Sequence, residues 1–133
     1  HHADIETVKQ EVDLFLDKHC PPGKLVMGVP AYARHESDPS MVRTFSELMD
    51  ESQSKAALSN TWNGFRYDSP DDMKVKVNYA KEKGLGGVFL WELGQDKQDP
   101  EQAPGGILLE AIAAAAAVID NDSSAPEESK TEL

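Results

Sequence analysis

The chain has 133 residues, with 13 Lys and Arg against 24 Asp and Glu, which gives a formal net charge of −11. This length suits one domain or less, and 39% hydrophobic residues indicate an ordinary globular composition. The acidic balance argues against a nucleic-acid partner and against an anionic membrane surface, because both need clustered Lys and Arg. The longest apolar run, Ile107–Ile119, is too short to span a membrane.

Metal and disulfide chemistry also find little support in the sequence. The single cysteine, Cys20, excludes an internal disulfide framework and a Cys-rich zinc site. The histidines show no helical i, i+4 pairing, so we expect neither a metal nor another cofactor. The chain starts at His1-His2 without a signal-peptide pattern. This predicts either a processed product or a sequence that begins within a longer gene.

The first third of the chain predicts a helix and then a strand. Residues 4–19 carry apolar side chains at spacings of three and four, with Asp4 as the N-cap and the prolines after Cys20 as the stop. Residues 25–32 are almost continuously apolar, which is typical of a parallel strand buried on both faces. Pro30 marks the C-terminal end of this strand.

The middle of the chain is more polar. Residues 35–60 predict irregular structure with a short helix around Thr44–Met49. Residues 62–67 alternate aromatic and polar side chains, which indicates a short strand or a hairpin turn. Ser69-Pro70 followed by two acids predicts the start of a helix that runs to about Lys83, with Gly84 just beyond its end.

A second apolar strand, 86–91, is followed by the polar segment 92–96 and by a last helix, Ile107–Ile119. Strands that alternate with helices predict a parallel sheet with right-handed crossovers. Two strands alone leave unpaired edges, so we expect either oligomerisation or a part of something larger. Residues 120–133 form a polar, acidic tail that we expect to be disordered.

Two blocks of the sequence resemble one enzyme family. Residues 23–34, GKLVMGVPAYAR, resemble the seventh-strand segment of glycoside hydrolase family 18, the chitinase family. Residues 67–96, from Tyr67 to Asp96, resemble its seventh helix and eighth strand. The resemblance implies an α/β chain whose residues 1–119 form the C-terminal part of a TIM (β/α)8 barrel, strands 7 and 8 with helices 6 to 8. Such a barrel needs about 250 residues.

The resemblance also implies a function. Family members hydrolyse glycans of N-acetylglucosamine with a Glu from an Asp-x-x-Asp-x-Asp-x-Glu signature on the fourth strand. This signature is absent here, since Met73 and Val75 stand where Asp68-x-x-Asp71 would need its next acids. We therefore expect no catalytic residue in this chain, but the substrate-binding side of a site for chitin-like glycans. The alternatives are an inactive, lectin-like relative and a small independent interaction protein.

Four residues are candidates for binding that glycan. Trp91 ends the second strand and matches the family's eighth-strand Trp, which implies a flat platform for a sugar ring; the alternative is a core Trp under a loop. Tyr32 lies at the C-terminal end of the first strand and Arg34 follows it; the two would form a rim of the cleft, or else an ordinary strand-end Tyr and a solvated Arg. Glu92, on the loop after Trp91, would bond the sugar or pair with a basic neighbour.

Nearby residues are expected to be structural. Asp96 shares the loop with Glu92, and structural pairing is the preferred interpretation of its carboxylate. Phe89, one alternation before Trp91, is expected in the core. Trp62 and Tyr67 are expected to pack beneath the loop; the alternative is that they extend the cleft as aromatic walls.

The last four residues, Lys130–Leu133, resemble a Lys-Asp-Glu-Leu retention signal with Thr131 in place of Asp. This predicts a secretory-pathway or extracellular protein, with retention in the endoplasmic reticulum as one destination.

Overall fold

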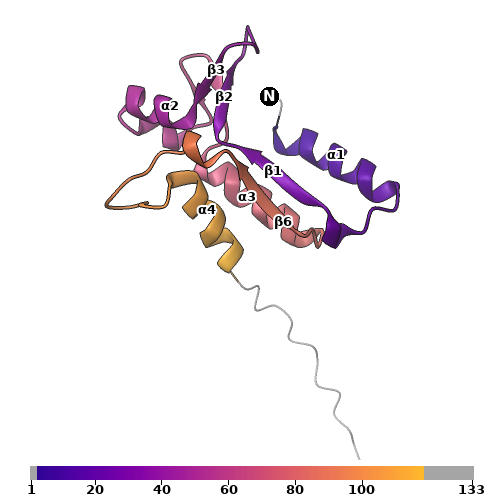
Figure 1. Cartoon of the computed structure of the whole chain (residues 1–133). Helices are drawn as coiled ribbons and strands as arrows, with labels where there is room; N and C mark the ends of the chain where they lie inside the picture. The colour runs from indigo at the N-terminus through magenta and orange to yellow at the C-terminus, as the bar shows by residue number, and fades with distance from the viewer. Residues whose placement is uncertain (1–2, 119–133) are drawn as a thin grey trace, which may run out of the picture.

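The computed structural model describes residues 3–118, which form a mixed α/β fold around two small sheets (Figure 1). The acidic tail and the predicted retention signal lie outside the described residues. One sheet is parallel and carries three helices. The other is antiparallel and lies beyond the C-terminal end of the first.

The parallel sheet pairs β1 (Val26–Pro30) with β6 (Gly87–Trp91). Val26 lies opposite Gly87 at one end of the pair, and Pro30 lies opposite Trp91 at the other. The predicted parallel pairing is confirmed, and so is the end of the first strand at Pro30. Both strands therefore present their carboxyl ends at the same edge.

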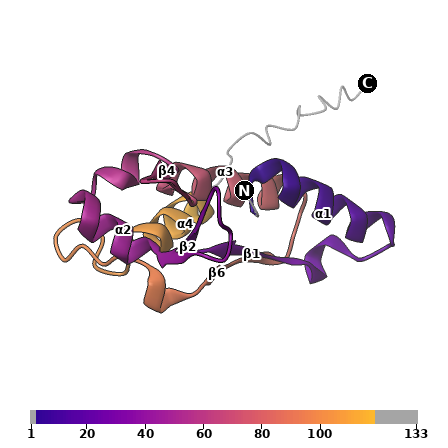
Figure 2. The same ribbon diagram turned by 90° about the horizontal axis from the view of Figure 1, so that it is seen from above.

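Three helices cover one side of this sheet, α1 (Ile5–Asp17), α3 (Pro70–Glu82) and α4 (Ile107–Ala117) (Figure 2). Their predicted starts are confirmed: Asp4 accepts a 2.9 Å hydrogen bond from the Thr7 amide, and Ser69 accepts one of 3.2 Å from the Asp72 amide. Gly84 lies just past α3 with a φ of +66°, as predicted. The buried side chains of this layer are Val8, Val12, Met27, Val29, Met73, Val77, Leu108 and Ile112.

Within residues 3–118, no element covers the opposite side of the parallel sheet. Val26 and Phe89 are each 48% exposed there, and Trp91 is 61% exposed. Side chains two residues apart share a face of a strand, so Phe89 and Trp91 point away from the helices together. The prediction that these strands are buried on both faces is wrong for the part of the chain that the structure describes. The placement of Phe89 in the core is wrong for the same reason.

The second sheet has the order β3 (Val42–Thr44), β2 (Tyr32–His35), β5 (Phe65–Arg66), β4 (Thr61–Trp62) and is antiparallel. The hairpin predicted over 62–67 is confirmed, but residues 35–60 are more regular than expected. They include α2 (Phe45–Ser52), which begins with a capping box of Thr44 and Glu47. The strands β2 and β3, of four and three residues, are too short to show a hydrophobic period, which is why the sequence pattern missed them.

Short 3-10 turns connect these elements at Pro22–Lys24, Lys55–Leu58 and Leu93–Gln95. A buried ion pair between Lys76 and Asp68 fastens the start of the chain. The Lys76 ammonium on α3 bonds both the Asp68 carboxylate and the Ala3 carbonyl oxygen. It thereby ties α3 to the segment that enters α1.

Candidate functional site

An open hollow of about 350 Å³ lies at the carboxyl end of the parallel sheet, on its bare side. Both strands contribute to it, together with the first residue of β2. The lining residues are Gly28, Val29, Pro30, Tyr32, Phe89 and Trp91. The hollow therefore has apolar and aromatic walls, and its two exposed rings come from Phe89 and Trp91.

Trp91 owes its position to the register of the sheet. It is the last residue of β6, and its carbonyl oxygen accepts a 2.7 Å hydrogen bond from the Ala31 amide. The Trp91–Glu92 peptide bond is cis. Beneath it, a Cβ on Gly28 would lie 2.8 Å from the Phe89 Cζ, so glycine leaves the space that the Phe89 ring occupies. The indole thus stands at the mouth of the hollow.

Tyr32 lines the hollow from β2, not from the end of the first strand as predicted. Arg34 follows on the same strand, with its guanidinium carbon 5.6 Å from the Tyr32 ring centroid. Its Nη1 donates a 2.7 Å hydrogen bond to the Pro39 carbonyl oxygen. The Arg34 guanidinium is thus held by its own loop, and it is not among the residues that line the hollow.

The two carboxylates after Trp91 are placed differently. Glu92 is exposed just past the strand and lies outside the lining of the hollow. Asp96 is buried and accepts hydrogen bonds from the Leu108 and Leu109 amides at 3.1 and 2.9 Å. Asp96 therefore caps α4 from across a loop, since the local N-cap residue, Gly106, has no side chain to do so. The expectation of a structural role for Asp96 is confirmed.

Of the two aromatic residues expected to be structural, Tyr67 lies in the core and Trp62 packs against it. Tyr67 is fully buried, and its hydroxyl donates a 2.8 Å hydrogen bond to the Ala56 carbonyl oxygen. Burial raises the pKa of Tyr67 to about 12. Trp62 is half-buried against the core. Neither residue lines the hollow.

Phe89 is the residue of the hollow that sequence reasoning did not assign to it. The signal was present in the alternation of Gly87, Phe89 and Trp91, which share one face of β6. A second hollow, of about 510 Å³, lies between α3 and α4 and has no aromatic ring in its lining. There Lys81 donates to the carbonyl oxygens of Ala115 and Val118, at 2.6 and 2.5 Å.

Within residues 3–118, no three His, Cys, Asp or Glu side chains gather as metal ligands would. Across the same residues, no helix is long and apolar enough to cross a membrane.

A comparison with protein-family models decides the family. The model for glycosyl hydrolases family 18 matches residues 1–96, which include β1, β6 and the hollow between them. The chain belongs to glycosyl hydrolase family 18. The resemblance seen in its two sequence blocks is thereby confirmed.

Relatives within family 18 are chitinases by name. Residues of this chain are 51% identical over 39 positions to Endochitinase 1 of Metarhizium robertsii, covering 29% of the chain and 9% of that protein. They are 25% identical over 126 positions to Chitotriosidase-1 of Mus musculus, covering 71% of the chain and 27% of that protein. The chain therefore spans about a quarter or less of these curated relatives.

Solved family 18 structures share the fold over most of the chain. A chitinase of Flavobacterium johnsoniae has a TM-score of 0.73 at 27% identity, covering 87% of this chain and 36% of its own. A chitinase of Cycas revoluta, solved in complex with (GlcNAc)4, has a TM-score of 0.65 at 26% identity, covering 82% of this chain and 38% of its own.

Proposed function

We propose that the hollow at the end of β1 and β6 is the substrate-binding side of a site for N-acetylglucosamine-containing glycans in a family 18 glycosidase. The observation that carries this proposal is the exposed indole of Trp91 at the carboxyl end of a parallel strand, with Tyr32 beside it. A flat apolar ring suits the CH face of a sugar, and the indole N–H remains able to bond a hydroxyl. The (GlcNAc)4 bound by the Cycas revoluta chitinase supports this ligand class.

The proposal includes the architecture of the whole protein. Residues 1–119 would supply strands 7 and 8 with helices 6 to 8 of a TIM barrel, and residues 120–133 would be an appended acidic tail. Two features support it: β1 and β6 leave one face uncovered, and the chain spans 36 to 40% of the first solved relatives. In a closed barrel, the bare face would lie inside, with Phe89 in the interior and Trp91 at its mouth.

We propose further that this chain does not hydrolyse glycans by itself, because the sequence lacks the Asp-x-x-Asp-x-Asp-x-Glu signature. The expected result is no turnover of a chitobiose-based chromogenic substrate by residues 1–133 above a blank without protein. Turnover above the blank would contradict this. A lectin-like parent protein would bind the same glycans without hydrolysis, and the residues of its fourth strand would tell the two apart.

The test of the site is Trp91→Ala in the full-length protein. Loss of the stacking face should weaken transition-state binding by about 1–2 kcal/mol, observed as a lower kcat/KM and, for an inactive parent, as weaker glycan affinity. Trp91→Phe keeps a flat ring and should retain part of the binding energy that Trp91→Ala loses. Neither change should lower the melting temperature, because the side chain is 61% exposed.

The matched stability control is Val77→Ala, which truncates a buried side chain of α3 that does not line the hollow. It should destabilise the protein by about 1–3 kcal/mol and leave glycan affinity in the folded protein unchanged. If Trp91→Ala behaved like Val77→Ala, with lower stability and unchanged glycan affinity, Trp91 would be a structural residue and the site assignment would be wrong.

The last four residues predict a secretory-pathway protein with a retention signal, and this cellular location stays a prediction. We expect tagged full-length protein to be found in the endoplasmic reticulum. After deletion of Lys130–Leu133, we expect it in the medium.

A further inference from the structure

We infer that Lys97 and Asp50 form a clasp that positions Trp91 relative to Tyr32 across the hollow. The inference rests on the proposed glycan site, because it names the residues that hold that site in shape. Neither residue lines the hollow itself, and neither is given a catalytic role.

Two arms leave the hollow from one point at its base. There the Ala31 amide donates to the Trp91 carbonyl oxygen at 2.7 Å, and the Ala31 carbonyl oxygen accepts from the Phe45 amide at 3.0 Å. One arm is the loop that continues from Trp91 to Lys97. The other is α2, which starts at Phe45 and reaches Asp50.

The clasp closes these arms at their far ends. The Lys97 ammonium lies 2.6 Å from the Asp50 carboxylate, and it joins residues 47 positions apart in the sequence. Between the arms and the base the contacts form a ring, from Trp91 through Ala31 and α2 to Asp50 and back through Lys97. A bond that closes such a ring restrains the loop more than a bond within one helix would, because the two arms can otherwise move separately.

The loop arm is also anchored to α4, at the same end that carries Lys97. Asp96 precedes Lys97 and bonds the first amides of α4, while the Lys97 carbonyl oxygen accepts from the Ile107 amide at 2.8 Å. Only the segment from Glu92 to Gln95 lies between Trp91 and this anchor. Motion of the anchor is therefore transmitted to Trp91 through a short 3-10 turn.

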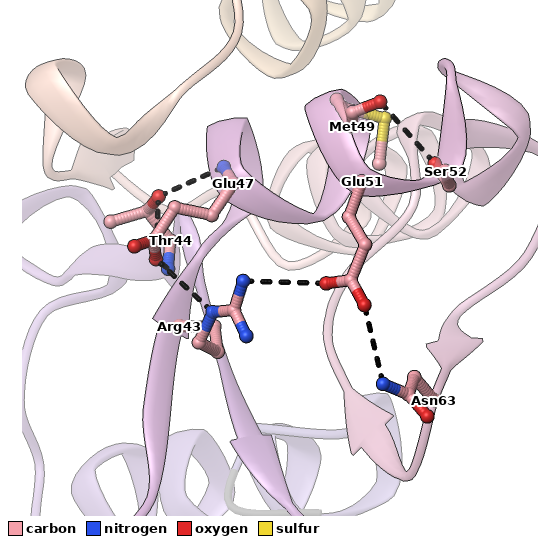
Figure 3. Close-up of polar contacts among 7 residues, drawn as sticks. All are labelled: Arg43, Thr44, Glu47, Met49, Glu51, Ser52 and Asn63. Atoms are coloured by element: carbon pink, nitrogen blue, oxygen red, sulfur yellow. Dashed lines mark hydrogen bonds and ion pairs between the residues drawn. The ribbon is translucent and has the colours of Figure 1, made fainter.

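The helical arm, α2, is held in place by polar contacts to the antiparallel sheet (Figure 3). Arg43 on β3 pairs with Glu47 and Glu51 on α2, at 3.6 and 3.3 Å. Glu51 also accepts a 3.3 Å hydrogen bond from the Asn63 side chain in the β4–β5 turn. These contacts fix α2 against the antiparallel sheet, so Asp50 presents its carboxylate from a held position.

The clasp is exposed to solvent, with 34% of the Lys97 side chain and 64% of the Asp50 side chain accessible. Its contribution is therefore modest and sensitive to salt. We expect Lys97→Met or Asp50→Asn to weaken the affinity for (GlcNAc)4 by about two- to fivefold at low salt. At about 1 M NaCl, where the Debye length falls to about 3 Å, the difference from the unmodified protein should become smaller.

The experiment combines NMR spectra of the 133-residue chain, recorded at a concentration where it is monomeric, with a titration of the full-length protein with (GlcNAc)4. The chain has two Trp residues, and Trp62→Phe assigns their indole N–H signals. Lys97→Met should shift or broaden the Trp91 signal without ligand and leave the Trp62 signal unchanged. The exchanged pair Asp50→Lys with Lys97→Glu should restore both the Trp91 signal and the affinity. Lys74→Met, which breaks an exposed pair with Asp71 on α3, is the matched control and should change neither.

The outcomes separate the clasp from the function. If the Trp91 signal and the affinity are the same in Lys97→Met and the unmodified chain, the clasp does not position Trp91 and the inference is wrong. If Lys97→Met changes the Trp91 signal but Trp91→Ala leaves the (GlcNAc)4 affinity of the full-length protein unchanged, the clasp stands and the proposed glycan site fails. Failure of the exchanged pair to restore the Trp91 signal would also overturn the clasp.

Discussion

Asp68 shows how much the interior of this protein can shift the pKa of one side chain. It is buried beside Lys76, and burial raises the pKa of Asp68 to about 6, while the Lys76 ammonium opposes the shift. The ordinary pKa is 3.8, so between pH 4 and 6 the native protein holds a proton that the unfolded chain has released. The stabilisation from this proton is complete below about pH 4 and is lost as the pH rises to about 6.

The first prediction compares the unmodified chain with Asp68→Asn in urea unfolding between pH 4 and 7. The free energy of unfolding of the unmodified chain should fall relative to the variant from pH 4 to 6, by at most about 1.4 kcal/mol per pH unit. Carboxylates whose pKa is lowered, such as Asp4 and Glu47, have the opposite pH dependence but are shared by both proteins. A difference that is constant across this range would contradict the raised pKa of Asp68.

A second prediction at this scale concerns two buried tyrosines. Tyr67→Phe removes the hydroxyl that satisfies the Ala56 carbonyl oxygen and should destabilise the chain by about 1–2 kcal/mol. Tyr79 is the matched control, because its buried hydroxyl has no hydrogen-bond partner within the described residues. Tyr79→Phe should be neutral or stabilising. If the two variants lost equal stability in thermal unfolding, the Tyr67 hydrogen bond would make no specific contribution to the stability of the fold.

At the scale of elements, the helix caps are of two kinds. The caps of α1, α2 and α3 come from the residue directly before each helix, and the sequence around Asp4 and Ser69 predicts them. The cap of α4 comes from Asp96, across the loop 97–105. No local pattern can indicate it, because no spacing rule links Asp96 to Gly106 across the nine residues between them.

Asp96→Ala should leave the first amides of α4 without an acceptor and lower the free energy of unfolding by about 1–2 kcal/mol. Hydrogen exchange at the Leu108 and Leu109 amides should become faster in this variant. Ser69→Ala removes the cap of α3 at a similar cost and should leave those two amides unchanged. Unaltered exchange at Leu108 and Leu109 in Asp96→Ala would mean that α4 does not depend on this cap.

At the scale of the whole molecule, the uncovered face of the parallel sheet dominates. Val26, Phe89 and Trp91 lie on that face, and α1 adds Leu14 and Phe15 to the exposed apolar surface. Unpaired strand edges and uncovered apolar faces favour association. We expect the 133-residue chain to self-associate in sedimentation velocity, and Val26→Ser with Phe89→Ser to reduce the association. A monomer that melts sharply and independently of concentration would favour an independent domain over a part of a barrel.

The sequence by itself determined the long elements and their type. Periodic apolar positions, caps and prolines place α1, α3, β1 and β6 to within a few residues, and two sequence blocks point to family 18. These signals are local, since each is carried by neighbouring residues whose spacing reflects the period of a helix or strand. The indole at the end of β6 belongs to this group, because its place follows from the strand that precedes it.

Only the tertiary structure decided which faces of these elements are exposed and which of their residues meet. It showed that the face of β6 that carries Phe89 and Trp91 is exposed, that Tyr32 belongs to a second sheet, and that Asp96 caps a helix beyond its own loop. It also brought Lys97 to Asp50. Each of these facts depends on contacts between segments far apart in the chain or on the absence of a cover over one face. Such contacts are set by how the layers pack in space, and no spacing along the chain records them.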